Sequence, residues 1–193
     1  MAYITLATLK TYRGVTKTSE DALLGDCITR AEAQIDSYTG RCFAAPTTAA
    51  THYLDAVRDV SDDKRTLYLD DDLYSVTAVI NGDGETVNST AYVTEPRHDT
   101  PYRSLRMKSG ASTYWTYDDN QEDAIQVGGR WGYSATPPAD IQQATIRLAS
   151  YIYAQKDAAV FDVTAMPDMG MMIIPQGLPR DVKEILDPYR RLR

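Results

Sequence analysis

Residues 19–39 carry the clearest helical pattern in the chain and most constrain its fold. Apolar side chains recur there at spacings of three and four, which places them on one helix face: Leu24, Ile28, Ala31, Ile35 and Tyr38. We expect Thr18 or Ser19 to cap the first turn and Gly40 to end the last one. The opposite face carries charged side chains that can meet water: Asp26, Arg30, Glu32 and Asp36. The segment therefore predicts one wall of a hydrophobic core.

Helical patterns occur towards both ends of the chain, with strand patterns between them. Further helices are predicted over 4–12, 138–156 and 180–187, and a β-rich insertion over about 50–134. This order predicts an α+β fold, in which N- and C-terminal helices form a bundle with the β-rich insertion between them. A length of 193 residues favours a single domain.

Within the insertion, period-two patterns predict six strands: 51–57, 66–70, 74–80, 84–95, 101–109 and 123–134. The run Asn81-Gly82-Asp83-Gly84 is typical of a hairpin turn, because Asn-Gly tolerates positive φ angles. The glycines of Gly128-Gly129-Arg130-Trp131-Gly132 indicate a bulge or a close backbone approach.

Composition excludes some classes of protein. A net charge of −7 argues against tight binding of nucleic acid, which is driven by counterion release. It is compatible with nucleic acid that passes the protein without being bound. No apolar run approaches the ~20 residues of a membrane span, and no signal-peptide pattern opens the chain, so we expect a cytoplasm-like compartment. Cys27 and Cys42 are expected to be free thiols. The 14 tyrosines, against 2 phenylalanines, favour an interaction protein.

Residue types that carry enzymatic chemistry are present, but not in working patterns. His52 and His98 lack the spacing of metal ligands, and we expect both at the surface. Adjacent acids are expected to be solvated turn residues, with a weak cation site as the less favoured interpretation: Asp62-Asp63, Asp70-Asp71-Asp72 and Asp118-Asp119. No nucleophile turn or phosphate loop occurs.

We therefore expect no catalytic residue, no metal ligand and no cofactor. A small metal-dependent hydrolase acting through Asp70, Asp71 and Asp72 is a remote alternative, because the sequence offers no further site geometry.

Two segments near the C-terminus each have a structural and a functional interpretation. Residues 157–178 have no clear period and contain four of the six methionines. They are either a surface connection or an irregular arm that docks on a partner. The basic end over 189–193 either complements the dipole of the last helix or pairs with acids on another chain.

Short segments spread over nearly the whole chain resemble the head–tail connector (adaptor) proteins of tailed bacteriophages and related gene-transfer particles. The resemblance lies in their order and spacing: Leu6-Ala7-Thr8-Leu9-Lys10, Glu20-Asp21-Ala22-Leu23-Leu24, Ile35-Asp36-Ser37-Tyr38-Thr39-Gly40-Arg41, Ile125 to Tyr133, Pro137 to Ala144, Leu178-Pro179, and Pro188-Tyr189-Arg190-Arg191.

The resemblance implies a non-enzymatic virion protein, assembled in the host cytoplasm and located in the neck between head and tail. Such proteins form a ring, usually twelve-fold, under the portal protein. They extend the channel for genomic DNA, which passes without sequence-specific binding, and dock the stopper or tail-completion protein. A neighbouring head-completion or tail-terminator protein is the alternative.

The resemblance also suggests contact residues. The C-terminal helix and tail are candidates for portal contact, and the methionine-rich arm is a candidate for intersubunit or portal contact. The candidates are Met166, Met169, Met171, Met172, Ile173, Ile174, Tyr189, Arg190, Arg191 and Arg193. Arg41 is a candidate for an intersubunit contact, with local capping of the preceding helix as the alternative.

Overall fold

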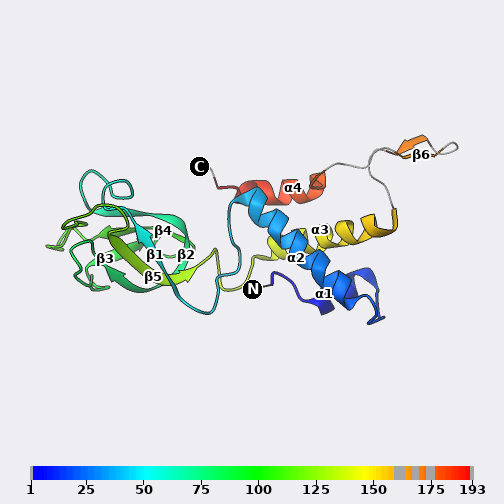
Figure 1. The fold of residues 1–193 in the computed structure, drawn as a ribbon, viewed down its shortest axis with the longest axis horizontal. Coiled ribbons are helices and arrows are strands. Elements are labelled where there is room, and N and C mark those ends of the chain that lie inside the picture. Colours follow the sequence, from blue (N-terminus) through cyan, green and yellow to red (C-terminus); the bar gives the residue numbers. More distant parts are fainter. Residues whose placement is uncertain (1, 159–163, 167–169, 173–176, 192–193) are drawn as a thin grey trace. The chain divides into compact units, whose positions relative to one another are not determined.

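The structure is a computed structural model that describes residues 2–158, 164–166, 170–172 and 177–191 (Figure 1). The chain divides into two compact units. One, here called the helical unit, contains residues 2–41 and the described part of 137–193, and thus the first and last described segments of the chain. The other, here called the β unit, contains residues 42–136. Helices and an antiparallel sheet together give the predicted α+β class.

The described helical unit contains four α-helices whose bounds lie within two residues of the predicted ones. They are α1 (Leu6–Arg13), α2 (Asp21–Thr39), α3 (Ala139–Ala158) and α4 (Arg180–Leu186), followed by a 3-10 turn over Asp187–Tyr189. Helix α2 packs against α3, which also contacts α1 and α4. The predicted apolar face of α2 is buried from Leu24 to Ile35, whereas Tyr38 is only half-buried. None of the described helices is long and apolar enough to cross a membrane.

The two ends of α2 differ in how well the sequence predicted them. Gly40 adopts the left-handed conformation with φ of 67°, and its amide donates to the Asp36 carbonyl at 2.8 Å, as predicted. The predicted cap at Thr18 or Ser19 is wrong, because the helix begins after Glu20 and no side chain caps it. The Glu20 carboxylate instead accepts a hydrogen bond from the Tyr153 hydroxyl on α3, at 2.5 Å.

The polar face of α2 is less open to water than its sequence indicates. The Tyr3 amide donates to the Glu32 carboxylate at 2.6 Å, and the Tyr3 hydroxyl donates to Asp36. Burial raises the pKa of Glu32 above its ordinary value, although the bond from the Tyr3 amide acts the other way. Burial likewise raises the pKa of Asp36 against the effect of the Tyr3 hydroxyl. The expectation of a solvated face is therefore wrong for these two acids.

The β unit is built on a five-stranded antiparallel sheet. The strands are β1 (Ala50–Leu54), β2 (Thr66–Ile80), β3 (Tyr92–Glu95), β4 (Tyr102–Met107) and β5 (Ile125–Trp131), in the spatial order β1-β5-β2-β4-β3. One cluster of buried side chains packs on this sheet and includes Trp115, whose ring nitrogen donates to the Arg65 carbonyl at 3.1 Å. The two edges of the sheet are β1 and β3.

Strand β2 corrects the prediction of two strands separated by a turn. It runs without interruption from Thr66 to Ile80, with a shift of register between Tyr68 and Leu73. The shift accommodates Asp70 and Asp71 at the exposed side, while Asp72 is 5% exposed. The acids interrupt the apolar alternation, and the sequence pattern alone reads such an interruption as a turn.

Two glycines of this unit, Gly82 and Gly129, lie so close to the backbone of another segment that a side chain would not fit. In the 81–84 turn the positive φ, 81°, belongs to Gly84, whereas the prediction relied on Asn81-Gly82. A side chain at Gly82 would lie 2.4 Å from the Thr116 carbonyl oxygen. A side chain at Gly129 would lie 2.4 Å from the Ser75 carbonyl oxygen, opposite another register shift in β2. The prediction of a bulge or close approach at the 128–132 glycines is confirmed.

Alanine substitutions at Gly40 and Gly25 should change stability in opposite directions, because Gly40 ends α2 in a left-handed conformation and Gly25 lies inside the helix. At Gly40 an alanine would lie an ordinary 3.7 Å from Arg191 Cβ, so its cost is the left-handed backbone, about 1 kcal/mol of lost stability. Gly25 lies inside α2 with open space around it, so Gly25→Ala should stabilise by about 0.5–1 kcal/mol. Denaturant unfolding measures both, and equal effects would contradict this account.

The half-buried acids Glu32 and Asp36 of α2 predict a defined pH dependence. A folded-state pKa above the unfolded value means that stability falls as pH rises through that raised pKa. Glu32→Gln keeps an oxygen for the Tyr3 amide but removes the charge. The free energy of unfolding of this variant should therefore exceed that of wild type most at about pH 7. This difference should shrink as pH falls through the raised pKa of Glu32.

Denaturation curves at several pH values measure that difference. Asp26→Asn, an exposed acid on the same helix, is the matched control. A gain for Glu32→Gln that grows as the solution is acidified would show that burial does not govern this carboxyl.

Candidate assembly site

The C-terminal segment of the helical unit is bound to the last turn of α2. The Arg191 amide donates to the Thr39 carbonyl at 2.8 Å, and Arg191 Cβ lies beside the Gly40 turn. We call residues 38–41 with 187–191 the C-terminal anchor. The sequence predicted both partners, the Tyr-Thr-Gly-Arg turn and the basic tail, but gave no sign that they meet, since about 150 residues separate them.

Arg41 has a local role in this anchor. Its Nε donates to the Tyr189 carbonyl oxygen at 2.6 Å, which fixes the chain just after the 3-10 turn. A charged donor on a backbone carbonyl is among the stronger hydrogen bonds. This contact joins two distant segments of the same chain and is not the predicted capping of α2, whose last turn ends on the Gly40 amide. The intersubunit role of Arg41 stays a prediction.

Tyr38, half-buried near the end of α2, also belongs to the anchor. Its hydroxyl donates to the Asp187 carboxylate at 2.5 Å, and the Arg190 guanidinium lies 5.2 Å above its ring. The hydrogen bond to Asp187 raises the pKa of Tyr38, with smaller contributions from desolvation and from the Asp187 charge, because ionising the hydroxyl would lose that bond. Tyr189 is half-buried, and its hydroxyl reaches Asp140 of α3 at 3.4 Å.

The other predicted contact residues are only partly described. Met166 ends the short strand β6 (Thr164–Met166), and Met171 and Met172 lie in β7 (Gly170–Met172), which pairs with β6 in antiparallel register. The expectation of a wholly irregular arm is therefore wrong for these strands. Four candidates lie outside the described residues: Met169, Ile173 and Ile174 of the arm, and Arg193 of the tail.

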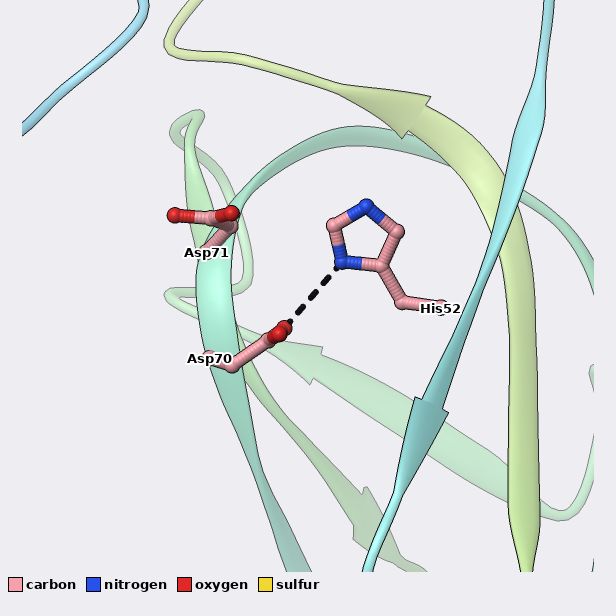
Figure 2. A group of neighbouring side chains, drawn as sticks. All are labelled: His52, Asp70 and Asp71. Atoms are coloured by element: carbon pink, nitrogen blue, oxygen red, sulfur yellow. Dashed lines mark hydrogen bonds and ion pairs between the residues drawn. The ribbon is translucent and has the colours of Figure 1, made fainter. Parts of the chain in front are cut away.

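The acidic clusters are arranged differently from one another. The pairs at 62–63 and 118–119 are exposed, as predicted. Asp70 and Asp71 instead lie in β2 beside His52, whose Nδ1 is 3.2 Å from the Asp70 carboxylate (Figure 2). Asp72 is not a member of this group among the described residues. The three acids of the hydrolase alternative therefore do not share one site.

Sequence reasoning missed the group formed by His52, Asp70 and Asp71. His98 is exposed, as predicted, but His52 is only partly exposed and packs flat on Trp131. The one available signal was the run of three acids between Leu69 and Leu73, which breaks a strand pattern. Nothing in the sequence links that run to His52.

The anchor predicts a local effect of Arg41→Ala. Losing the bond from Arg41 Nε to the Tyr189 carbonyl should cost about 1 kcal/mol or more, so the Arg191 amide should exchange with deuterium at least about fivefold faster. Hydrogen exchange resolved to this peptide measures the effect. Arg30→Ala, an exposed arginine of α2, is the control, and an equal response from both variants would contradict the assignment.

Solved structures share this fold. A chain in the neck of an empty gene transfer agent (GTA) particle, computed with C6 symmetry, is 18% identical with a TM-score of 0.62, covering 99% of this chain and 91% of that one. A chain of the native GTA virion is 19% identical with a TM-score of 0.60 over 99% and 91%. A chain in the native GTA neck, computed with C12 symmetry, is 18% identical with a TM-score of 0.60 over 99% and 90%. At these identities the likeness shows the fold.

The family is shown by the sequence itself. No curated protein matches the chain. The model of a family described as "Head completion protein" matches residues 2–192, almost the whole length. This confirms the sequence-based resemblance to head–tail connector proteins at the level of a connector and completion protein family. The chain therefore belongs to the head completion protein family.

Proposed function

We propose that this protein is a non-enzymatic component of the virion neck, a head–tail adaptor that forms a ring under the portal. The observation that carries the proposal is the match to the head completion family over residues 2–192. The shared fold with chains of GTA necks supports it, since that likeness spans 99% of this chain. In this role the ring extends the DNA channel and docks the stopper or tail.

In the proposed role the two compact units act as a single adaptor domain. The helices from the two ends of the chain form the bundle, and the β unit is the insertion between them. The contacts of α3 with α1, α2 and α4 support this arrangement of the bundle.

Ring formation requires two different faces on each subunit that meet head to tail and close. Exposed tyrosines are suited to such faces because they combine apolar area with a polar tip. In the β unit these are Tyr53, Tyr68, Tyr114 and Tyr117. We propose a dodecamer, and the C6 and C12 symmetries of the similar GTA necks are compatible with that number. A net charge of −7 favours a lumen that repels phosphate and leaves DNA mobile.

The C-terminal segment is the proposed portal contact. The anchor fixes it to α2 up to Arg191, and Arg190 is exposed there. The basic residues 190, 191 and 193 can pair with acids on the portal. The methionine-rich arm is proposed to contact a neighbouring subunit or the portal, because methionine side chains adapt to varied surfaces.

A second position in the same neck is the alternative. A head-completion ring further from the portal, or a tail terminator, would use similar ring contacts. Which ring the chain occupies distinguishes them, and electron microscopy of the intact neck with this chain located relative to the portal measures that directly.

Binding to purified portal tests the proposed contact. Replacing Arg190, Arg191 and Arg193 together by alanine should weaken portal binding by at least about tenfold, equivalent to about 1.4 kcal/mol, because several ion pairs are lost at once. Arg97→Ala with Arg103→Ala, two exposed arginines of the β unit, is the matched control. Wild-type protein that stays monomeric with portal and completion proteins, and is absent from virions, would overturn the function itself.

A further inference from the structure

His52 occupies an unusual position for an ionisable side chain. It lies on the edge strand β1, in register with buried Val127 of β5, and therefore on the face of the sheet that carries the core. Its ring stacks on Trp131 with centroids 3.7 Å apart and planes 7° apart. The Trp131 ring nitrogen donates to the Ala50 carbonyl at 3.0 Å. The imidazole is thus held in one orientation by a ring that is itself fixed.

Two carboxylates reach the same imidazole from β2. In a regular strand, neighbouring side chains point to opposite faces, so Asp70 and Asp71 could not both approach one point. The register shift between Tyr68 and Leu73 removes that restriction. One ligand atom from each of His52, Asp70 and Asp71 lies within 4.8 Å of the others (Figure 2).

We propose that His52, Asp70 and Asp71 form a zinc-binding site in the β unit, a role separate from the proposed place in the neck. Nitrogen and oxygen ligands lie about 2.0–2.2 Å from Zn²⁺, which in tetrahedral geometry places them about 3.4 Å apart. The His52 to Asp70 distance of 3.2 Å already fits. The remaining separations are at most 4.8 Å, so they need a contraction of at most about 1.4 Å, which a turn of the exposed Asp71 side chain can supply. Water completes the coordination.

The ligand chemistry favours zinc over the harder cations. Calcium takes six to eight oxygen ligands, and magnesium keeps most of its water, so neither uses an imidazole well. The nearby cation Arg58 is engaged by other acids, since its guanidinium lies 3.3 Å from Asp55 and 3.0 Å from Asp59. Without metal, His52 Nδ1 and the Asp70 carboxylate lie 3.2 Å apart in a direct contact, and zinc takes the place of that contact.

The site has a structural consequence. Strands β1 and β2 are not neighbours, because β5 lies between them. An ion held by His52 and the two aspartates would therefore link the edge strand β1 to β2, across the intervening strand β5. A ligand that binds only the folded state stabilises it by mass action, so zinc should raise the melting temperature.

Zinc titration by calorimetry, with thermal unfolding in parallel, tests the site on the full chain. We expect one Zn²⁺ per chain and a higher melting temperature. His52→Phe keeps the aromatic stack on Trp131 but removes the ligand, and it should weaken zinc affinity by more than about tenfold. Asp71→Asn should have a similar effect. Circular dichroism without metal shows whether each variant folds.

The chain offers matched controls. His98→Ala removes the other histidine, and the double change Asp118→Asn with Asp119→Asn removes another adjacent pair of exposed acids. Both should bind zinc as wild type does. The proposal is overturned if wild type binds no zinc at about 1 mM, if folded His52→Phe binds as tightly as wild type, or if Mg²⁺ or Ca²⁺ binds as well as Zn²⁺.

Discussion

The helical unit depends on the contact between the end of α2 and the C-terminal segment. The Arg41 side chain and the Thr39 carbonyl bind backbone groups of Tyr189 and Arg191, which lie about 150 residues further along the chain. Closing an unstructured loop of that length would cost about 4 kcal/mol in chain entropy alone. Because residues 42–136 form a compact unit of their own, the effective loop is much shorter. Folding of the insertion therefore lowers the entropy cost of bringing the two ends together, compared with an unstructured loop of the same length.

Tyrosine hydroxyls donate to three acids of this unit, which gives part of the excess of tyrosine over phenylalanine a structural reason. Tyr3 donates to Asp36, Tyr38 to Asp187 and Tyr153 to Glu20. A phenylalanine at position 3 or 153 would leave a partly buried carboxylate without that donor, whereas the partner of Tyr38, Asp187, is exposed. The sequence suggested an interaction surface for the tyrosines. That interpretation now applies to the exposed ones, whereas these three serve the fold.

The sequence predicted what local patterns control and missed what distant residues decide. The buried face of α2 and its ending at Gly40 follow from spacing and from backbone conformation, so both were predictable. The start of α2 after Glu20, without a side-chain cap from Thr18 or Ser19, was not predicted, and neither was the bond from Tyr153 on another helix to the Glu20 carboxylate. Continuity of β2 through three acids depends on a register shift against β4. The grouping of His52 with Asp70 likewise requires the sheet order, which no local pattern contains.

The anchor also bears on how a tail such as this one could bind. The bond from the Arg191 amide to the Thr39 carbonyl fixes the C-terminal segment at the end of α2. Association is weakened by the entropy of ordering the segments that bind. A segment that already has a fixed origin loses less freedom when its charges meet a partner than one tethered through a long linker. Arg41 would then contribute to assembly through the position of the tail, without itself touching the partner.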